Sequence, residues 1–427
     1  NFTFSIIMIE FRSLYRSLPR PLRQLVEPAK RIFSFWENSR CHLWVVEGCE
    51  RHTGSRLTLG FAGNEAMKNY VSRALFSEGG AERGLGRQWV FQNSSKAARL
   101  GADVDVFACE IPRALEDTFQ PECLALLPTW IRMDGDLQNG SRVCNSKKFV
   151  QTRALVEREG LVAEAGHDPI LFEKFYQTIY LPYIALRHES AAIVDSLDVA
   201  RRKFVSEGRE LLRVFKAGRL LGGIVVSFDG DGARFWVLGV CSEEKLSLGA
   251  GVVSDVLYYF GILRGLDKGC SFLNFGYCRP FLADGLIRYK REWGGRLVND
   301  RMAMSGALAL SIVRHGPAVK SFLEQNPFVA IDGPRRVKVC GFVGDGPEAS
   351  EAMRARHSRY CDPSQVGLQL YSLSPEIRPR SLSAVLVPAF TDDCSDRSES
   401  CKVQACGEGG PPRGRRRRQG RTSSGVI

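Results

Sequence analysis

The sequence lacks the long hydrophobic runs and the paired cysteines that define several classes of protein. No apolar stretch reaches the roughly 18 residues that a membrane-spanning helix needs. Met302 to Val313, about a dozen residues, is expected to form a core or surface helix. The 13 cysteines are scattered and never form Cys-x-x-Cys, the spacing of many zinc and redox motifs. We therefore expect free thiols in a reducing cytoplasm.

Two further absences narrow the function. The six histidines lack the spacing of a metal-binding pair, so no metal is predicted. The segment Asn1 to Ile9 is too short and has too few basic residues to be a secretory signal. The sequence therefore does not indicate a metalloenzyme or a secreted protein, and the expected location is the cytoplasm.

The charge of the chain is uneven. Its 427 residues predict two or three domains, and the formal net charge of +12 is concentrated at the two ends. Residues 413–421 carry six arginines and no acid, and Phe11 to Arg40 carries seven basic residues against two acidic ones. Such ends are either solvated tails or surfaces for phosphate or for the inner face of a membrane. Both interpretations stay open, including peripheral membrane contact through the basic N-terminus.

The first half is expected to be an α/β domain. Short apolar runs bounded by turn residues predict its strands, and helical spacing predicts one helix over Asn64 to Phe76. The predicted strands are His42 to Glu47, Arg56 to Ala62, Gln88 to Gln92 and Asp103 to Ala108. No motif of this half is repeated in the second half.

The second half has a regular order of elements: strand, helix, helix, three strands, helix, strand, helix. The first helix, Ile170 to Tyr180, is expected to stop at Pro182. The long apolar helix is expected to end near Lys268-Gly269, a basic residue followed by a glycine stop. The other predicted elements are Leu161 to Ala165, Asp195 to Ser206, Leu211 to Phe215, Leu220 to Phe228, Ala233 to Cys241 and Phe272 to Phe275.

This order resembles the GNAT acyltransferase superfamily, and three segments are most similar to its FemAB-like branch. They are Ser146-Lys-Lys-Phe-Val-Gln-Thr-Arg, the step into Asn274-Phe-Gly, and Tyr289-Lys290 followed by Trp293-Gly294. The resemblance covers about a third of the chain, roughly Ser141 to Val298. It implies an α/β (α+β layered) fold. Tandem GNAT-like domains would each have a mixed, largely antiparallel central sheet flanked by helices.

Composition and resemblance together predict five parts. They are a basic leader (1–40), a divergent α/β domain that is GNAT-like by analogy (41–140), a GNAT/FemAB-like domain (141–330), a small strand-helix-strand addition (331–375) and a disordered basic tail (376–427).

The resemblance also implies a donor site where the central helix begins. GNAT enzymes hold the coenzyme A pyrophosphate on free backbone amides there. The predicted cofactor-binding residues are Lys245, Leu248, Gly249, Ala250 and Gly251. Leu246 replaces the polar first residue of the family signature, so the donor is either acyl-CoA, such as acetyl-CoA, or an aminoacyl-tRNA. A turn into the helix without a donor is the alternative.

Lys290 and Tyr289 are the predicted catalytic residues. The resemblance implies that Lys290 lies near the donor carbonyl, where an ammonium stabilises the developing negative charge, and that Tyr289 shapes the donor pocket. The alternative is a solvated lysine on a basic helix face. The predicted substrate-binding residues are Asn274, Gly276, Arg279 and Trp293. Arg279 could bind a phosphate or carboxylate or form a structural ion pair, and Trp293 could instead be core.

These residues favour an N-acyltransferase that moves an acetyl or aminoacyl group to an amine of a cell-envelope or polysaccharide precursor. That precursor would be a small molecule or linked to a lipid or nucleotide, and tRNA is a further expected partner. Two alternatives stay open: an acyl-CoA-dependent enzyme acting on a small-molecule or protein amine, and a catalytically degenerate GNAT-fold binding module.

Overall fold

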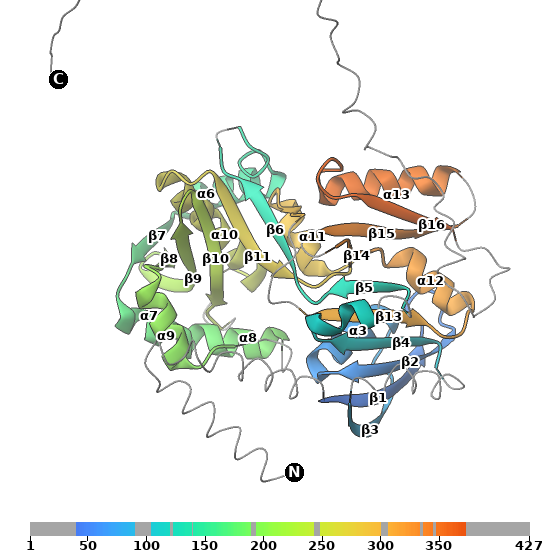
Figure 1. Cartoon of the computed structure of the whole chain (residues 1–427). Helices are drawn as coiled ribbons and strands as arrows, with labels where there is room; N and C mark the ends of the chain where they lie inside the picture. The colour runs from blue at the N-terminus through green and yellow to red at the C-terminus, as the bar shows by residue number, and fades with distance from the viewer. Residues whose placement is uncertain are drawn as a thin grey trace, which may run out of the picture. The chain divides into compact units, whose positions relative to one another are not determined.

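The computed structural model describes residues 40–89, 104–119, 123–138, 140–188, 194–242, 248–299, 306–333, 336–344 and 347–372 (Figure 1). These residues form three β-sheets flanked by helices. Lys245, the leader up to residue 39 and the tail predicted over 376–427 lie outside them. Within the described residues, no helix is long and apolar enough to cross a membrane.

The first sheet has six strands in the order β3-β1-β2-β4-β13-β5. Its parallel pair is β2 and β4, and all its other pairs are antiparallel. Helix α3 (Glu65–Leu75) follows β2 and begins at Asn64, whose side chain accepts a hydrogen bond from the Met67 amide. The strands are β1 (Arg40–Cys49), β2 (Arg56–Gly63), β3 (Ala81–Trp89), β4 (Val106–Ile111), β5 (Ala125–Pro128) and β13 (Ala307–Ile312).

The second sheet has seven strands in the order β12-β6-β11-β10-β9-β8-β7. Its parallel pair is β10 and β11, between which the chain forms the 18-residue helix α10 (Ala250–Asp267). Gly269, just after α10, has a φ of 72°, the left-handed conformation that ends helices. The strands are β6 (Ile131–Asp136), β7 (Leu161–Gly166), β8 (Glu210–Lys216), β9 (Arg219–Asp229), β10 (Gly232–Val240), β11 (Phe272–Cys278) and β12 (Arg296–Leu297).

The helices of this half follow the predicted order, with one correction. The prediction that Pro182 stops the first helix is wrong, because α7 (Pro169–Phe175) continues through a π-helical turn, Tyr176–Tyr180, into α8 (Leu181–His188). Pro182 has no backbone N–H to donate to the preceding turn, and the wider π turn before it makes room for its ring. The other helices are α6 (Lys147–Glu159), α9 (Leu197–Ser206) and α11 (Gly285–Glu292).

The third sheet is small, in the order β14-β15-β16. Strands β15 (Val337–Val343) and β16 (Leu368–Ser372) are parallel and are joined by helix α13 (Pro347–Tyr360). Strand β14 (Phe328–Ile331) pairs antiparallel with β15 and follows α12 (Pro317–Gln325). The short helical turns η2 (Arg113–Leu115) and α5 (Glu116–Phe119) complete the described elements.

The two large sheets exchange strands. Strand β6 precedes residue 140 but pairs with β11 and β12 in the second sheet. Strand β13 follows β12, the last strand of the second sheet, but lies between β4 and β5 in the first sheet. The boundary expected at residue 140 therefore does not separate the sheets. The helix expected over Met302 to Val313 is also wrong, since 307–312 is a strand. Its apolar run is that of a buried central strand, which periodicity cannot distinguish from a helix.

The predicted fold class is confirmed, because both large sheets are mixed, largely antiparallel and flanked by helices. In each large sheet a single parallel pair is bordered by antiparallel strands on both sides, and the next described element after the first strand of that pair is a helix, α3 after β2 and α10 after β10. The two halves therefore repeat one arrangement although no sequence motif is repeated.

We predict that Leu310→Ala in β13 lowers the free energy of unfolding by about 2–5 kcal/mol. Leu310 is fully buried in the core that joins the first sheet to α3 and α12. Urea denaturation measures this loss. Val162→Ala on the edge strand β7, where the side chain is 56% exposed, is the control and should change stability by about 0.5 kcal/mol or less. A Leu310→Ala protein as stable as this control would contradict the placement of β13.

Candidate functional site

The second sheet opens where its two parallel strands part. Strands β10 and β11 pair only from Gly232 with Phe272 to Arg234 with Asn274, although both strands continue. Each strand is irregular just beyond this point, β10 between Phe235 and Val237 against β9, and β11 between Asn274 and Tyr277 against β6. The backbone therefore diverges at this point and leaves a wedge between the strands.

Asn274 and Gly276 build the irregular turn in β11. The Asn274 side-chain oxygen accepts a hydrogen bond from the Gly276 amide at 2.7 Å. Gly276 has a φ of 80°, which a residue with a side chain adopts only with strain. A Cβ atom at this position would lie 3.7 Å from both the Lys290 Nζ and the Phe235 carbonyl oxygen. Asn274 and Gly276 therefore shape the wedge, and neither of them lines the cavity that lies beside it.

A cavity of about 780 Å³ lies beside this wedge. The three β10 residues after Phe235, Trp236 to Leu238, form one wall. Residues of the π-helical turn and of α6, α8, α10 and α11 form the others, among them Tyr180, Lys148, Tyr183, Gly251, Ser254, Asp255, Leu286, Tyr289 and Glu292. The walls are mainly apolar, with a few charged groups, as is usual for a small-molecule site.

The first turn of α10 borders the cavity. Its N-cap residue, Gly249, has no side chain that could accept hydrogen bonds from the first backbone amides of the helix. Gly251 lines the cavity. Among the described residues, no atom lies within 4 Å of a Cβ built on either glycine, so none of them fills the space in front of this turn. Leu248 and Ala250 are partly buried against the core. Free amides at the positive end of a helix can bind a phosphate.

Asp255 is a cavity residue that sequence reasoning missed. Its carboxylate accepts hydrogen bonds from the Tyr289 hydroxyl at 2.9 Å and from the Lys148 Nζ at 2.6 Å, and so joins α10 to α11 and α6. The available signal was a carboxylate in the second turn of a mainly apolar helix. Burial, together with the nearby Tyr258 and Asp255, raises the pKa of Tyr289 well above its usual range.

Lys290 faces the wedge and not the cavity. Its side chain is only 3% exposed, and its Nζ donates a hydrogen bond to the Tyr277 carbonyl oxygen at 2.9 Å. The ammonium therefore lies at the point where β11 leaves β10. The solvated lysine considered from the sequence is wrong, because the structure buries this side chain.

Trp293 belongs to the core of the second half. It is fully buried and its ring lies 5.6 Å from that of Tyr258. It does not line the cavity.

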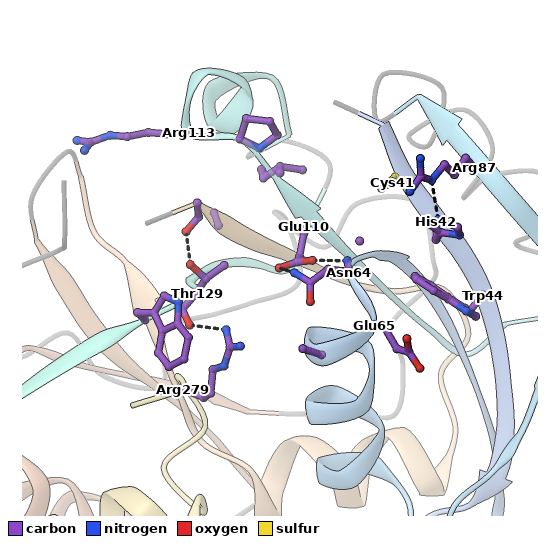
Figure 2. A pocket seen from close by; sticks show the side chains of 17 residues that line it. Cys41, His42, Trp44, Asn64, Glu65, Arg87, Glu110, Arg113, Thr129 and Arg279 are labelled. Atoms are coloured by element: carbon purple, nitrogen blue, oxygen red, sulfur yellow. Dashed lines mark hydrogen bonds between the residues drawn. The ribbon is translucent and has the colours of Figure 1, made fainter. Parts of the chain in front are cut away.

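Arg279 lies in a different cavity, of about 760 Å³, that belongs to the first half (Figure 2). Its guanidinium is 3.8 Å from the ring centre of Trp130 and donates to the Thr129 carbonyl oxygen at 3.2 Å. The same cavity contains Glu110, which accepts hydrogen bonds from the backbone and side-chain nitrogens of Asn64. Burial raises the pKa of Glu110. The structure therefore separates Arg279 from Tyr289 and Gly251, with which the sequence grouped it.

We predict that Tyr289→Phe lowers the free energy of unfolding by about 1.5–3 kcal/mol near neutral pH, because Asp255 loses a donor to a charged group. A raised pKa in the folded state means that this contribution is complete below about pH 10, the usual tyrosine pKa, and is lost as pH rises. Urea denaturation at about pH 7 and about pH 11 should therefore show the difference between wild type and variant shrinking at the higher pH. A difference that grows with pH would contradict it.

Comparison with known proteins gives structural matches only. No family model and no curated protein matches the chain. The L-PGS structure from Bacillus licheniformis matches with 12% identity and a TM-score of 0.32, covering 64% of this chain and 85% of that one. FemX matches with 10% identity and a TM-score of 0.32, covering 56% and 78%. A tandem GNAT protein from the clavulanic acid biosynthesis pathway matches with 12% identity and a TM-score of 0.29, covering 62% and 82%. All three TM-scores lie below 0.5, so the fold is defined by the strand order and register of this chain: two mixed, largely antiparallel sheets flanked by helices.

Proposed function

We propose that the chain is an N-acyltransferase whose activated donor binds in the cavity at the start of α10. The observation that carries this proposal is that cavity, bordered by the open first turn of α10, beside the wedge where β10 and β11 part. A chain carrying an acyl group can enter such a cavity while its phosphates stay at the helix terminus.

The walls suit a donor with an apolar arm and an anionic end. Tyr180, Tyr183 and Trp236 offer aromatic surface. Arg187, whose guanidinium lies 5.3 Å from the Tyr183 ring centre, and Arg288 offer positive charge. Acyl-CoA and aminoacyl-tRNA share this chemistry, since both join an acyl group to a phosphate-containing carrier.

Lys290 would assist the acyl transfer from the wedge. In this reaction the acceptor nitrogen attacks the donor carbonyl, a C–N bond forms, the C–S or C–O bond breaks, and the nitrogen loses a proton. The Lys290 ammonium donates to the Tyr277 carbonyl oxygen and also lies beside the Cys278 thiol. A further N–H of this ammonium would donate to the oxyanion. Glu292 lines the cavity and is our candidate to receive the proton, because Asp255 already accepts two hydrogen bonds.

The acceptor we propose is an amine of a cell-envelope or polysaccharide precursor. This finer assignment depends on Tyr289-Lys290 and Trp293-Gly294, which resemble the FemAB-like branch. A binding module without activity is the second candidate. The burial of Lys290 and its hydrogen bond to a backbone oxygen favour it, because a lysine held in this way is satisfied without a substrate.

We predict that the protein binds coenzyme A or acetyl-CoA with a dissociation constant on the order of micromolar, and that Gly251→Trp abolishes this binding. The space around Gly251 accommodates a new side chain, which would fill the cavity. Isothermal titration calorimetry measures the affinity. Gly316→Trp is the matched control, since Gly316 is also an open glycine at the start of a helix, α12.

Absence of coenzyme A binding by a well-folded protein would favour an aminoacyl-tRNA donor, with charged tRNA as the next ligand. Equal binding by the wild type and Gly251→Trp would place the donor elsewhere and contradict the proposal.

We further predict that Lys290→Ala and Lys290→Met fold but lose on the order of 100-fold or more in turnover, because the oxyanion loses its cation. Met keeps the apolar stem of the lysine, so it separates charge from packing. The assay is thiol release from acetyl-CoA, or deacylation of charged tRNA, over a panel of amines. Lys147→Ala, at an exposed position in the first turn of α6, is the control. Turnover near that of wild type in Lys290→Met would contradict the role of Lys290.

A further inference from the structure

We propose that the Arg279 cavity of the first half is a second ligand site, for a molecule with an anionic group, either a phosphate or a carboxylate. This site does not depend on the donor cavity at α10. Arg279 is its anion-binding residue, and Glu110 would accept a hydrogen bond from a donor group of the same ligand.

The guanidinium of Arg279 is held in a fixed position. One face stacks on Trp130 at 3.8 Å, and the Nη1 donates to the Thr129 carbonyl oxygen. Thr129 is itself held by two hydrogen bonds to the Gly306 carbonyl oxygen, from its amide at 3.1 Å and from its hydroxyl at 3.3 Å. A fixed planar fork is the side-chain geometry that suits carboxylate and phosphate oxygens.

Arg279 also has hydrogen-bond capacity left over. Its Nε and Nη2 have no acceptor among the described residues of the chain, and no carboxylate lies within ion-pair distance of it there. Burial lowers its pKa, while the nearby carboxylates of Glu110 and Asp284 act in the opposite direction. A half-buried guanidinium in a fixed position, with two N–H donors that no described residue accepts, is able to bind an anion.

Glu110 provides a counterpart on another wall. Its two oxygens accept from the Asn64 amide at 2.6 Å and from the Asn64 Nδ2 at 2.7 Å, which fixes the carboxylate (Figure 2). Gly63 makes room for it, since a Cβ there would lie 2.5 Å from the Glu110 Oε2. Each oxygen keeps a lone pair for a donor of the ligand.

The location repeats that of the donor cavity. Gly63, Asn64 and Glu65, at the junction of β2 and α3, line the Arg279 cavity, and Gly251 in α10 lines the other. In both sheets the helix follows the first strand of the single parallel pair. The first half thus has a cavity where the second half has its own, but with different chemistry: a fixed cation and a fixed carboxylate.

The test is titration of the full chain with two anionic probes, inorganic pyrophosphate and N-acetylglycine, followed by tryptophan fluorescence and calorimetry. Trp130 and Trp44 line the cavity and report on it. We expect saturable binding of at least one probe, and which probe binds identifies phosphate or carboxylate as the group recognised. Gly251→Trp, which fills the other cavity, should bind as the wild type does.

Arg279→Gln should weaken this binding by roughly tenfold or more, because a charge-assisted contact is lost. Arg213→Gln is the control, since Arg213 pairs with Glu164 on the surface of β8 and β7. Ala66→Trp is a second variant, which fills the cavity from α3 and leaves Arg279 intact. It should abolish binding whether or not Arg279→Gln folds.

Three results would overturn the proposal. They are no saturable binding of either probe by the wild type, unchanged affinity in folded Arg279→Gln or Ala66→Trp, and loss of binding in Gly251→Trp. The last result would assign the probes to the cavity at α10. If the protein binds coenzyme A but neither probe, the proposal of a donor cavity at α10 stands and only the proposal of the second site is overturned.

Discussion

The separation of β10 from β11 is the constraint on which the second half depends. Backbone groups that no longer pair across two strands must find other partners. The Gly276 amide donates to Asn274 and the Tyr277 carbonyl oxygen accepts from Lys290, so a side-chain amide and an ammonium replace the missing strand contacts. Gly276 permits the turn itself, because its φ is positive. Asn274, Gly276 and Lys290 belong to the motifs that resemble the FemAB-like branch. These residues therefore also shape the wedge between β10 and β11.

A second network joins the helices around the cavity. Asp255 accepts from Lys148 of α6 and Tyr289 of α11, so one carboxylate fixes the position of two neighbouring helices. The cavity walls therefore depend on a charged contact as well as on packing. Tyr289 contributes to both, since its ring also packs at 5.1 Å on the buried Tyr258.

Much of the second half could be predicted from its sequence, because its elements are local and strongly patterned. The strands from Leu211 to Cys241 and the long helix lie within a few residues of their predicted limits, and the glycine stop at Gly269 is present. The strands β5, β6 and β13 were missed. Strand β5 is short and β13 is buried on both faces, so neither shows a local period. Strand β6 alternates, but it contains two aspartates and a glycine, which are uncommon in strands, and its partners are distant in sequence.

The site was harder to predict than the fold. Tyr289 and Gly251 line one cavity as a group, whereas Arg279 lies in another. The five consecutive residues Asn274 to Cys278 face different parts of the structure, because the strand has a bulge between Asn274 and Tyr277. Asp255 could not be found from spacing alone, since its partners come from helices that are distant in the sequence.

The exchange of β6 and β13 has a consequence for biosynthesis. A ribosome releases the chain from its N-terminus, so strands β1 to β5 emerge before the strand that must lie between β4 and β5. The first sheet cannot close until residue 312 has left the exit tunnel, after every strand of the second sheet has emerged. Until then β4 and β5 present open edges, of the kind that chaperones cover. Of the two large sheets, the one that begins first is therefore completed last.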